Sequence, residues 1–460
     1  MRYVSTRGGM KEASFSEAVM TGLAPDGGLI VPGRVPDVSG KLETWSSLSY
    51  RDLALEILKE FTDLREPALK ALIDKSYSVF AAPEVTPVRK VGCMHVLELF
   101  HGPTLSFKDI ALQFLGNLFE LVLTSSGGRI NILGATSGDT GSAAIYGVRG
   151  KRNLSIFMMH PKGRISETQE RQMTTVLDDN VMNIALEGTF DDCQKVAKTL
   201  FRDLGFKRRF ALSAVNSINW VRIVCQVVYY FYAAFRVMER SGRERVRFSV
   251  PTGNFGDIFA GFMAGRMGLP IERLVLATNE NDILARFFNT GRYERGSVKS
   301  TISPAMDIQV ASNFERYLYY REGEDAGRVR DMMTEFEQSG VLETADGAVE
   351  NFITAGTAGT GEALDVIRDI YRSENYVVDP HTAVGIAVGR TQASADIPLI
   401  CLATAHPAKF AESVSKATNG YTPRHPSLDR LADLPGRCAV LPASVSAVRE
   451  FIKGNAGGDA

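Results

Sequence analysis

Lys108 is the residue in this sequence whose surroundings most clearly favour chemistry. It lies in the stretch His101–Asp109, which leads into an apolar segment, Ile110–Leu123, long enough for about four helical turns. Ser106 and Asp109 have the spacing of a capping box, which predicts a helix start at this point. In the first turn of a helix, unpaired backbone N–H groups disfavour an ammonium, so the neutral, nucleophilic amine of Lys108 is easier to form. The alternative is an ordinary surface lysine.

Two loops elsewhere in the chain have the composition of anion-binding sites. Thr136–Gly141 follows a predicted strand, Ile130–Ala135, and combines glycines with hydroxyl side chains. Backbone N–H groups at such a strand–loop–helix junction can hold a phosphate or a carboxylate, and the alternative is a polar turn that only caps a helix. Pro251–Asp257 follows a second predicted strand, Arg245–Val250, and lacks the GxGxxG spacing of dinucleotide-binding loops. Asp257 would oppose an anion at this helix start unless its side chain points away.

Two further places in the chain have residues that could contribute to a binding site. Thr404 ends the predicted strand Ile397–Thr404, where its hydroxyl would face a cleft beyond the sheet. Gly356–Gly361 is similar in composition to the other two loops, but we expect it to follow no strand and to have no role in binding. The sequence has neither a Walker P-loop nor a histidine–cysteine cluster of the kind that binds zinc.

A nucleophilic lysine, a phosphate-binding loop and a carboxylate-binding loop together indicate an enzyme that uses pyridoxal phosphate. This cofactor needs an amine for its Schiff base and a fixed anchor for its phosphate. The amino-acid substrates of such enzymes need a carboxylate site.

The pattern along the chain indicates which elements position these residues. Residues 1 to about 90 lack a regular alternation and predict an N-terminal cap, in which Ser5–Arg7 either reaches a site or forms a plain surface strand. After this region, short apolar strands alternate with helices, which is typical of an α/β fold with mostly parallel strands covered by helices. The predicted strands are Ile130–Ala135, Leu154–Met159, Asn183–Leu186, Arg245–Val250, Leu274–Thr278 and Ile397–Thr404.

Length and composition are those of an ordinary globular protein. The 460 residues exceed the size of one core, and we expect a cap over residues 1–90, a smaller α/β domain over 91–240 and a larger one over 241–460. Hydrophobic residues make up 45% of the chain and the net charge is −1, with no basic stripe to bind nucleic acid. The longest apolar run, Ile223–Phe235, is too short to span a bilayer and predicts a buried helix. The N-terminus lacks a signal pattern, so we expect a cytoplasmic protein without a membrane partner.

Six segments, spread over nearly the whole chain, carry a resemblance to a known family and follow one another in that family's order. They are Tyr3–Gly8, His101–Asp109, Gly134–Gly141, Asn216–Trp220, Pro251–Asp257 and Ala403–Phe410. In these segments the sequence resembles the threonine synthases, in particular their longer bacterial and fungal type. The resemblance implies the fold of the tryptophan synthase β family (fold type II of pyridoxal phosphate enzymes), with two open, mostly parallel, twisted sheets covered by helices and an N-terminal cap region. It also implies a lyase of threonine biosynthesis, which converts O-phospho-L-homoserine and water into L-threonine and phosphate by γ-elimination and β-addition of water.

The resemblance also implies which residues contact the cofactor. Lys108 matches the lysine that forms the Schiff base and then removes the α-proton of the substrate. The loop whose backbone amides hold the cofactor phosphate is matched by Gly253, Asn254, Phe255 and Asp257. Thr404 matches the hydroxyl that hydrogen-bonds the pyridine nitrogen of the cofactor.

The resemblance also provides candidates for binding the substrate. The loop that grips its α-carboxylate is matched by Thr136, Ser137 and Thr140. Asp139 stands where many related enzymes have an asparagine against O3′ of the cofactor, and its role is left open. The candidates for binding the substrate phosphate are Lys162, Arg164 and Arg222, for which solvated charges at helix ends are the alternative.

Two alternative functions can be weighed against these motifs. A phospho-lyase acting on the same substrate would release 2-oxobutyrate, phosphate and ammonia. A catalytically inactive homologue that serves as a binding protein would be expected to lose the lysine, whereas Lys108 and both loops are present. We expect a small-molecule substrate, no nucleic acid, and a monomer or homodimer.

Overall fold

The computed structural model describes residues 1–136, 138–214, 217–344 and 351–456. Contacts within the chain divide it into two compact units. The first unit contains Met1–Asp74, Phe80–His101 and Ser217–Pro423. The second unit contains Lys75–Val79, Gly102–Asn216 and Arg424–Ala460.

This division differs from the three consecutive ranges expected from the sequence, 1–90, 91–240 and 241–460. The N-terminal region groups with the first unit, and the chain returns to the second unit after Pro423. Strand and helix patterns give the order of the elements along the chain. They do not show which sheet a returning segment joins, so consecutive ranges were the simplest division available.

The first unit is built on a six-stranded sheet in the order β13-β10-β9-β14-β4-β3. Its strands are β3 (Val88–Val91), β4 (Met94–Glu98), β9 (Val246–Pro251), β10 (Ile271–Thr278), β13 (Ile353–Thr357) and β14 (Leu399–Ala403). The pairs are parallel except for β3 with β4, which are antiparallel. The central strands are apolar and buried because helices cover both faces. The mostly parallel sheet predicted from the sequence is confirmed.

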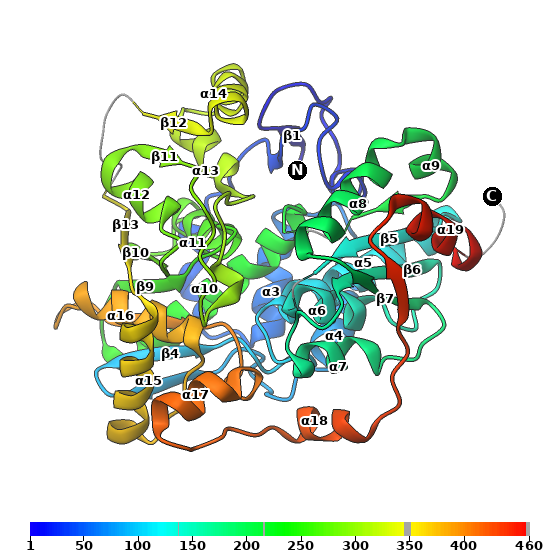
Figure 1. Cartoon of the computed structure of the whole chain (residues 1–460). Helices are drawn as coiled ribbons and strands as arrows, with labels where there is room; N and C mark the ends of the chain where they lie inside the picture. The colour runs from blue at the N-terminus through cyan, green and yellow to red at the C-terminus, as the bar shows by residue number, and fades with distance from the viewer. Residues whose placement is uncertain (137, 215–216, 345–350, 457–460) are drawn as a thin grey trace. The chain divides into compact units, whose positions relative to one another are not determined.

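Helices lie on both sides of these strands (Figure 1), with α10 and α11 against β9 on one side and α16 on the other. α15 packs on α16, and α17 packs on α15. The helices of the first unit are α1 (Phe15–Thr21), α2 (Leu42–Ser46), α3 (Tyr50–Lys59), most of α4 (Glu66–Tyr77), α10 (Trp220–Ser241), α11 (Gly256–Arg266), α12 (Ile283–Thr290), α13 (Phe314–Arg321), α14 (Ala326–Ser339), α15 (Thr360–Glu374), α16 (Pro380–Thr391) and α17 (Ala411–Thr418). A separate two-stranded sheet pairs β11 (Arg292–Glu294) with β12 (Val341–Glu343) in antiparallel register.

The helix α10 is longer than the apolar run Ile223–Phe235 that predicted it. With 22 residues it is long and apolar enough to cross a membrane, but 89% of its most apolar window is buried inside the protein. It is therefore a core helix, as the sequence predicted.

The N-terminal region packs against the start of α10 through aromatic side chains. Tyr3 of β1 (Tyr3–Ser5) lies against the ring of Trp220, with 6.2 Å between the centroids, and its hydroxyl donates to the carbonyl of Phe61 at 2.6 Å. The ring of Phe61 also lies 6.0 Å from that of Trp220. β1 pairs with β2 (Ile30–Pro32) in an antiparallel ribbon. The N-terminal region is thus part of the first unit, and its aromatic contacts belong to the core of that unit.

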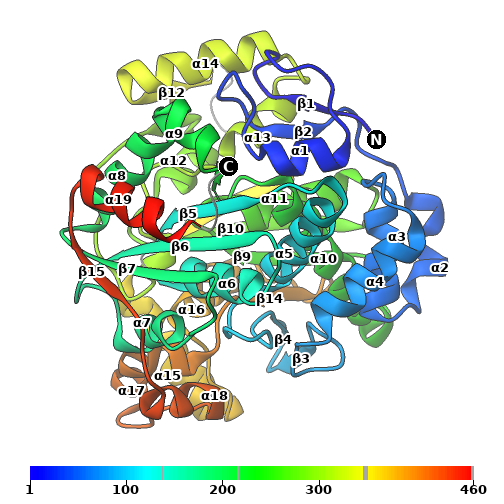
Figure 2. The ribbon, with the colours of Figure 1, turned by 90° about the vertical axis from the view of Figure 1, so that its right-hand side faces the viewer.

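The second unit contains a parallel five-stranded sheet in the order β15-β7-β6-β5-β8. Its strands are β5 (Ile130–Ala135), β6 (Leu154–Pro161), β7 (Val181–Glu187), β8 (Leu212–Ser213) and β15 (Ala439–Pro442). Its helices are α5 (Lys108–Ser126), α6 (Asp139–Val148), α7 (Glu167–Thr174), α8 (Phe190–Arg202), α9 (Leu204–Arg209), α18 (Pro426–Asp429) and α19 (Val445–Asn455). Figure 2 shows β5, β6 and β7 as neighbours, with β15 next to β7. Val448 and Ile452 of α19 are fully buried in the same apolar cluster as Ile184 of β7.

All six strands predicted from the sequence are present, with ends shifted by a few residues. The expectation that Gly356–Gly361 follows no strand is wrong, because β13 ends within it at Thr357. β13 reads Ile-Thr-Ala-Gly-Thr and is only partly apolar, so it lacks the run that marks the buried central strands.

Candidate active site

Lys108 is the first residue of α5, as the sequence predicted, and it is buried. The predicted capping box is wrong. The residue before the helix is Phe107, whose side chain makes no capping hydrogen bond, and the Asp109 carboxylate accepts hydrogen bonds from the backbone and the hydroxyl of Thr104, both at 2.8 Å. Asp109 therefore closes the turn that precedes the helix and so fixes the position from which Lys108 projects.

An ion pair joins Lys108 to Asp139, the first residue of α6. Lys108 Nζ lies 3.6 Å from Asp139 Oδ2, and the two side chains are only 10% and 6% exposed. The buried amide of Gln169 donates to the other carboxylate oxygen of Asp139 at 3.1 Å. A carboxylate in this position stabilises the ammonium form of the amine, which the helix start alone would disfavour. Asp139, whose role the sequence left open, is thus a direct partner of Lys108.

Close packing between α5 and α6 holds this pair in place. A Cβ atom on Gly116 of α5 would overlap the carbonyl of Gly147 of α6, and a Cβ on Gly147 would overlap the carbonyl of Leu112. Only glycine at these positions allows the two backbones to approach so closely. The two helix starts that carry Lys108 and Asp139 are therefore fixed relative to each other.

The predicted carboxylate-binding loop connects β5 to α6. The Thr136 hydroxyl accepts hydrogen bonds from the backbone N–H groups of Gly138 and Gly141, both at 3.0 Å. Thr136 is buried and shapes the loop from inside, whereas Thr140 is half-buried in the first turn of α6. Ser137 lies outside the described residues.

The predicted cofactor-phosphate loop connects β9 to α11. A Cβ atom on Gly253 would overlap the carbonyl of Ala305, so the loop backbone here has room only for glycine. Phe255 has a left-handed backbone with φ of 65°, and its buried ring stacks on Phe288 at a centroid distance of 6.0 Å. The strained residue is anchored by this aromatic contact. A glycine cradle at a helix start, in which no side chain caps α11, fits the phosphate of pyridoxal phosphate.

Asp257 is turned away from the loop toward α10. Its Oδ1 accepts hydrogen bonds from the hydroxyls of Tyr229, at 2.5 Å, and Tyr230, at 3.0 Å. Burial raises the pKa of both tyrosines far above the ordinary value, and the Asp257 carboxylate raises it further, so both remain donors. The sequence required Asp257 to point away if the loop binds an anion, and the structure meets that condition.

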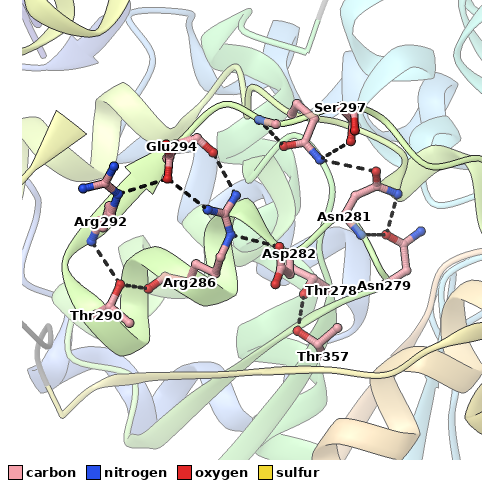
Figure 3. Close-up of polar contacts among 12 residues, drawn as sticks. Thr278, Asn279, Asn281, Asp282, Arg286, Thr290, Arg292, Glu294, Ser297 and Thr357 are labelled. Carbon is pink, nitrogen blue, oxygen red and sulfur yellow. Dashed lines mark hydrogen bonds and ion pairs between the residues drawn. The ribbon is translucent and has the colours of Figure 1, made fainter. Parts of the chain in front are cut away.

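The segment that covers Gly253 is held by a polar network that sequence reasoning missed. Asn279 and Asn281 lie just beyond the end of β10 and both donate to Asp307 Oδ1, at 2.7 and 3.1 Å. Figure 3 shows the two asparagines in contact, with Asn281 bonded to the Asn279 side chain. On the other side of the segment, the N–H of Ala305 donates to Nε2 of the buried His381 at 3.2 Å. The pair of asparagines after a predicted strand was the available signal.

The three basic candidates for a phosphate have different surroundings. Arg222, in the first turn of α10, is 6% exposed, and its Nη1 has no hydrogen-bond partner within the described part of the chain. Burial lowers the pKa of Arg222 to about 10. Lys162 is about half exposed and pairs with Glu187 at 3.2 Å, and Arg164 is exposed. The description as solvated charges therefore applies to Lys162 and Arg164, but not to Arg222.

Two other predicted positions follow strands of the first unit. Thr404 comes directly after β14 and is buried, in the place the sequence predicted. At the start of α15, carboxylates of the protein already occupy the backbone donors: Glu280 accepts from the N–H of Thr360 at 2.7 Å, and Glu362 from that of Gly359 at 2.8 Å. The loop Gly356–Gly361 thus follows a strand, yet its anion-binding groups are satisfied internally.

Three family models together match most of the chain. "Threonine synthase N terminus" matches residues 2–77, "Pyridoxal-phosphate dependent enzyme" matches residues 81–398, and "Threonine synthase, C-terminal" matches residues 382–452.

Individual relatives and solved structures agree with these matches. The chain is 47% identical to the threonine synthase of Schizosaccharomyces pombe, over 91% of this chain and 90% of that protein, and 45% identical to that of Pseudomonas aeruginosa, over 99% of both. The crystal structure of pyridoxal-phosphate-bound threonine synthase from Brucella melitensis superposes with a TM-score of 0.94 at 42% identity, covering 100% of both chains. The yeast threonine synthase structure gives a TM-score of 0.93 at 42% identity, covering 99% of this chain and 98% of that one. The chain belongs to the threonine synthase family.

Proposed function

We propose that this protein converts O-phospho-L-homoserine and water into L-threonine and phosphate, the last step of threonine biosynthesis, with pyridoxal phosphate as its cofactor. The observation that carries the proposal is the buried ion pair between Lys108 and Asp139, in a chain that matches the threonine synthases along its length. The cofactor, when bound, withdraws electrons from the substrate's Cα. We also propose a cytoplasmic monomer or homodimer.

Lys108 is the residue we propose for the Schiff base and for removing the α-proton. A base must change its protonation state during turnover, and an isolated ammonium in a buried place would be costly. Asp139 lies within ion-pair distance of the Lys108 amine. Its carboxylate balances the positive charge of the amine whenever the amine is protonated. Gln169 holds the Asp139 carboxylate in this orientation through its amide hydrogen bond.

We propose that the cofactor phosphate binds to the backbone amides of the loop at the start of α11. The glycine cradle at Gly253 and the outward turn of Asp257 support this assignment. Residues Asn254 and Phe255 complete the loop, and Thr404 is the hydroxyl that we propose for the pyridine nitrogen. A hydroxyl there leaves the protonation of that nitrogen adjustable, because no full charge faces it.

For the substrate, we propose that its α-carboxylate binds at the loop between β5 and α6, and its phosphate at Arg222. Thr140 and the loop amides are the donors for the carboxylate, together with Ser137, while Thr136 keeps the loop in shape. A guanidinium buried with an unused Nη1 donor is costly unless an anion pairs with it, which favours Arg222 over Lys162 and Arg164.

The products of a single incubation test the proposal. We expect purified protein given O-phospho-L-homoserine in oxygen-18 water to release L-threonine, with the label in its hydroxyl group, and only a small amount of 2-oxobutyrate. Water exclusion by the buried Lys108 region favours completion of the addition over loss of the intermediate. NMR and mass spectrometry measure the two products. If 2-oxobutyrate and ammonia predominate, the protein is a phospho-lyase.

A further inference from the structure

Asn313, just before α13, contacts both segments of the first unit that we assign to phosphate groups. Its backbone N–H and its Nδ2 both donate to the carbonyl of Asn254 in the cofactor-phosphate loop, at 3.1 Å each. The same Nδ2 donates at 3.2 Å to the carbonyl of Ser217, in the segment that leads into Arg222. One amide side chain therefore ties the two segments together.

Arg316, one turn further along, fixes the orientation of this amide. The side chain is fully buried, and its guanidinium donates to Oδ1 of Asn313 and, at 2.5 Å, to the carbonyl of Ile218. It also makes two hydrogen bonds, at 3.1 and 3.0 Å, to the carbonyl of Ile30 in β2. Burial lowers the pKa of Arg316 to about 9. A planar fork of donors can reach three carbonyl groups at once, which lysine cannot do.

The N-terminal region holds the same helix from the other side. The Thr6 hydroxyl donates to Glu315 Oε1 at 2.6 Å, and Arg7 forms a two-pronged contact with the Glu315 carboxylate at 3.0 and 2.9 Å. The side chains of Thr6 and Arg7 are therefore engaged with Glu315, and the Ser5 hydroxyl donates to Asp26 at 2.8 Å, so this segment is not a plain surface strand. The contacts of Thr6 and Arg7 anchor α13.

Gly256, the first residue of α11, marks where these parts meet. A Cβ atom there would lie 3.2 Å from Asn313 Nδ2 and 3.6 Å from the side chain of Ile223, the residue after Arg222. The start of α11 thus lies close to both the first turn of α10 and the Asn313 amide. A shift of the amide would move one helix start relative to the other.

We infer that Asn313 and Arg316 are positioning residues that set the distance between the cofactor-phosphate loop and Arg222. Because the functions of those two segments rest on the proposed function above, the pair would fix the spacing between the cofactor phosphate and the substrate phosphate. Such spacing matters because a displacement of about 1 Å at a reacting centre can greatly reduce the rate.

Two substitutions of Asn313 test the inference. Asn313→Ala removes the whole amide, and Asn313→Asp removes only the Nδ2 donor while keeping an acceptor for Arg316, so the second variant keeps the helix anchored. We expect both to raise the dissociation constant of pyridoxal phosphate for the apoprotein and the KM for O-phospho-L-homoserine by about tenfold, as expected for two lost hydrogen bonds. Arg316→Lys should have the same double effect.

Asn183→Ala is the matched control. Asn183 is a buried asparagine of β7 whose amide donates to the carbonyl of Met173 at 2.9 Å, in the second unit. The Asn183→Ala substitution should lower the melting temperature without changing the dissociation constant of pyridoxal phosphate or the KM for O-phospho-L-homoserine. If the Asn313 variants lose stability as this control does but keep both constants within twofold of the wild type, the inference is overturned. The cofactor titration needs no turnover, so a wild type that makes no threonine would overturn the proposed function and leave this measurement valid.

Discussion

At the scale of single residues, the basic candidates for binding the substrate phosphate differ in their burial and in the partners of their side chains. Arg222 and Lys162 are equivalent candidates in the sequence, where solvated charges at helix ends are the alternative for each. In the structure Arg222 is buried, with an Nη1 donor that has no partner among the described residues, whereas Lys162 is paired with Glu187 at the surface. Burial depends on the packing of distant segments, so the sequence could not rank the two.

Replacing these two residues checks the difference. Arg222→Gln should raise the KM for O-phospho-L-homoserine at least about tenfold, because a charged hydrogen bond to phosphate is worth roughly 1.5–3 kcal/mol. It should also raise the fraction of 2-oxobutyrate, since a loosely held phosphate opens the site to water. Lys162→Gln is the matched control and should change neither value. Steady-state kinetics and product analysis by NMR give both quantities, and equal effects of the two substitutions would contradict the assignment.

A second residue-scale prediction concerns Asp139. Asp139→Asn keeps the shape of the side chain but removes the charge 3.6 Å from Lys108. We expect kcat to fall at least about tenfold, a loss of roughly 1.4 kcal/mol or more, while the dissociation constant of pyridoxal phosphate changes little. Asp178→Asn, which breaks a partly exposed ion pair with Arg149 in the same unit, is the control and should leave kcat unchanged. A normal kcat in Asp139→Asn would show that the carboxylate is not needed.

The sequence located several of these residues correctly and misjudged their local bonding. Lys108 is at a helix start, as predicted, and Asp257 points away from its loop, which is the condition that the sequence set for an anion to bind there. The capping box failed because Thr104, five residues before Asp109, supplies better donors for that carboxylate. A spacing rule considers only the two residues it names and cannot weigh such a competitor.

At the scale of elements, α11 and α15 both start within a glycine-containing loop, but their surroundings differ. α11 begins without a side-chain cap, whereas α15 begins with its N–H groups bonded to Glu280 and Glu362. Glu280 comes from the loop after β10, far away in sequence. The composition of a loop therefore predicts that it can bind an anion, and only the fold shows whether the protein has already supplied one.

Two glycines in these loops form a matched pair for a test. Gly253→Ala should weaken cofactor binding at least about tenfold, because the new methyl group would overlap the carbonyl of Ala305 and displace the loop. Gly361→Ala, at a position with open space around it, should leave binding unchanged. Titration of each apoprotein with pyridoxal phosphate measures the effect. Full cofactor affinity in Gly253→Ala would remove the support for placing the phosphate in this loop.

At the scale of the whole molecule, strand patterns predicted both the α/β class and the parallel sheets. They could not predict that residues 424–460 return to the second unit, because β15 is short and half-exposed and its pairing partner lies far back in the sequence. The apolar side of α19 provides the energetic reason for this return. Val448 and Ile452 have no exposed surface and complete an apolar cluster that includes Phe157 of β6.

Ile452→Ala should therefore destabilise the second unit. We expect a loss of about 2–5 kcal/mol, as for other large-to-small changes in a packed core. Val440→Ala, at a half-exposed position of β15, is the control and should cost less than about 0.5 kcal/mol. Denaturant unfolding followed by circular dichroism measures both changes. An Ile452→Ala midpoint equal to that of the wild type would mean that α19 is not part of the core.

The pairing of β15 with β7 also has a consequence for synthesis on the ribosome. β7 ends at Glu187 and its edge partner begins at Ala439, about 250 residues later. At roughly 5–20 residues per second, the ribosome needs about 12–50 s to make the intervening chain. During that time the buried strand β7 has an unpaired edge, which is a template for aggregation. The nascent protein thus depends on residues 424–460 to protect the edge of a sheet made much earlier.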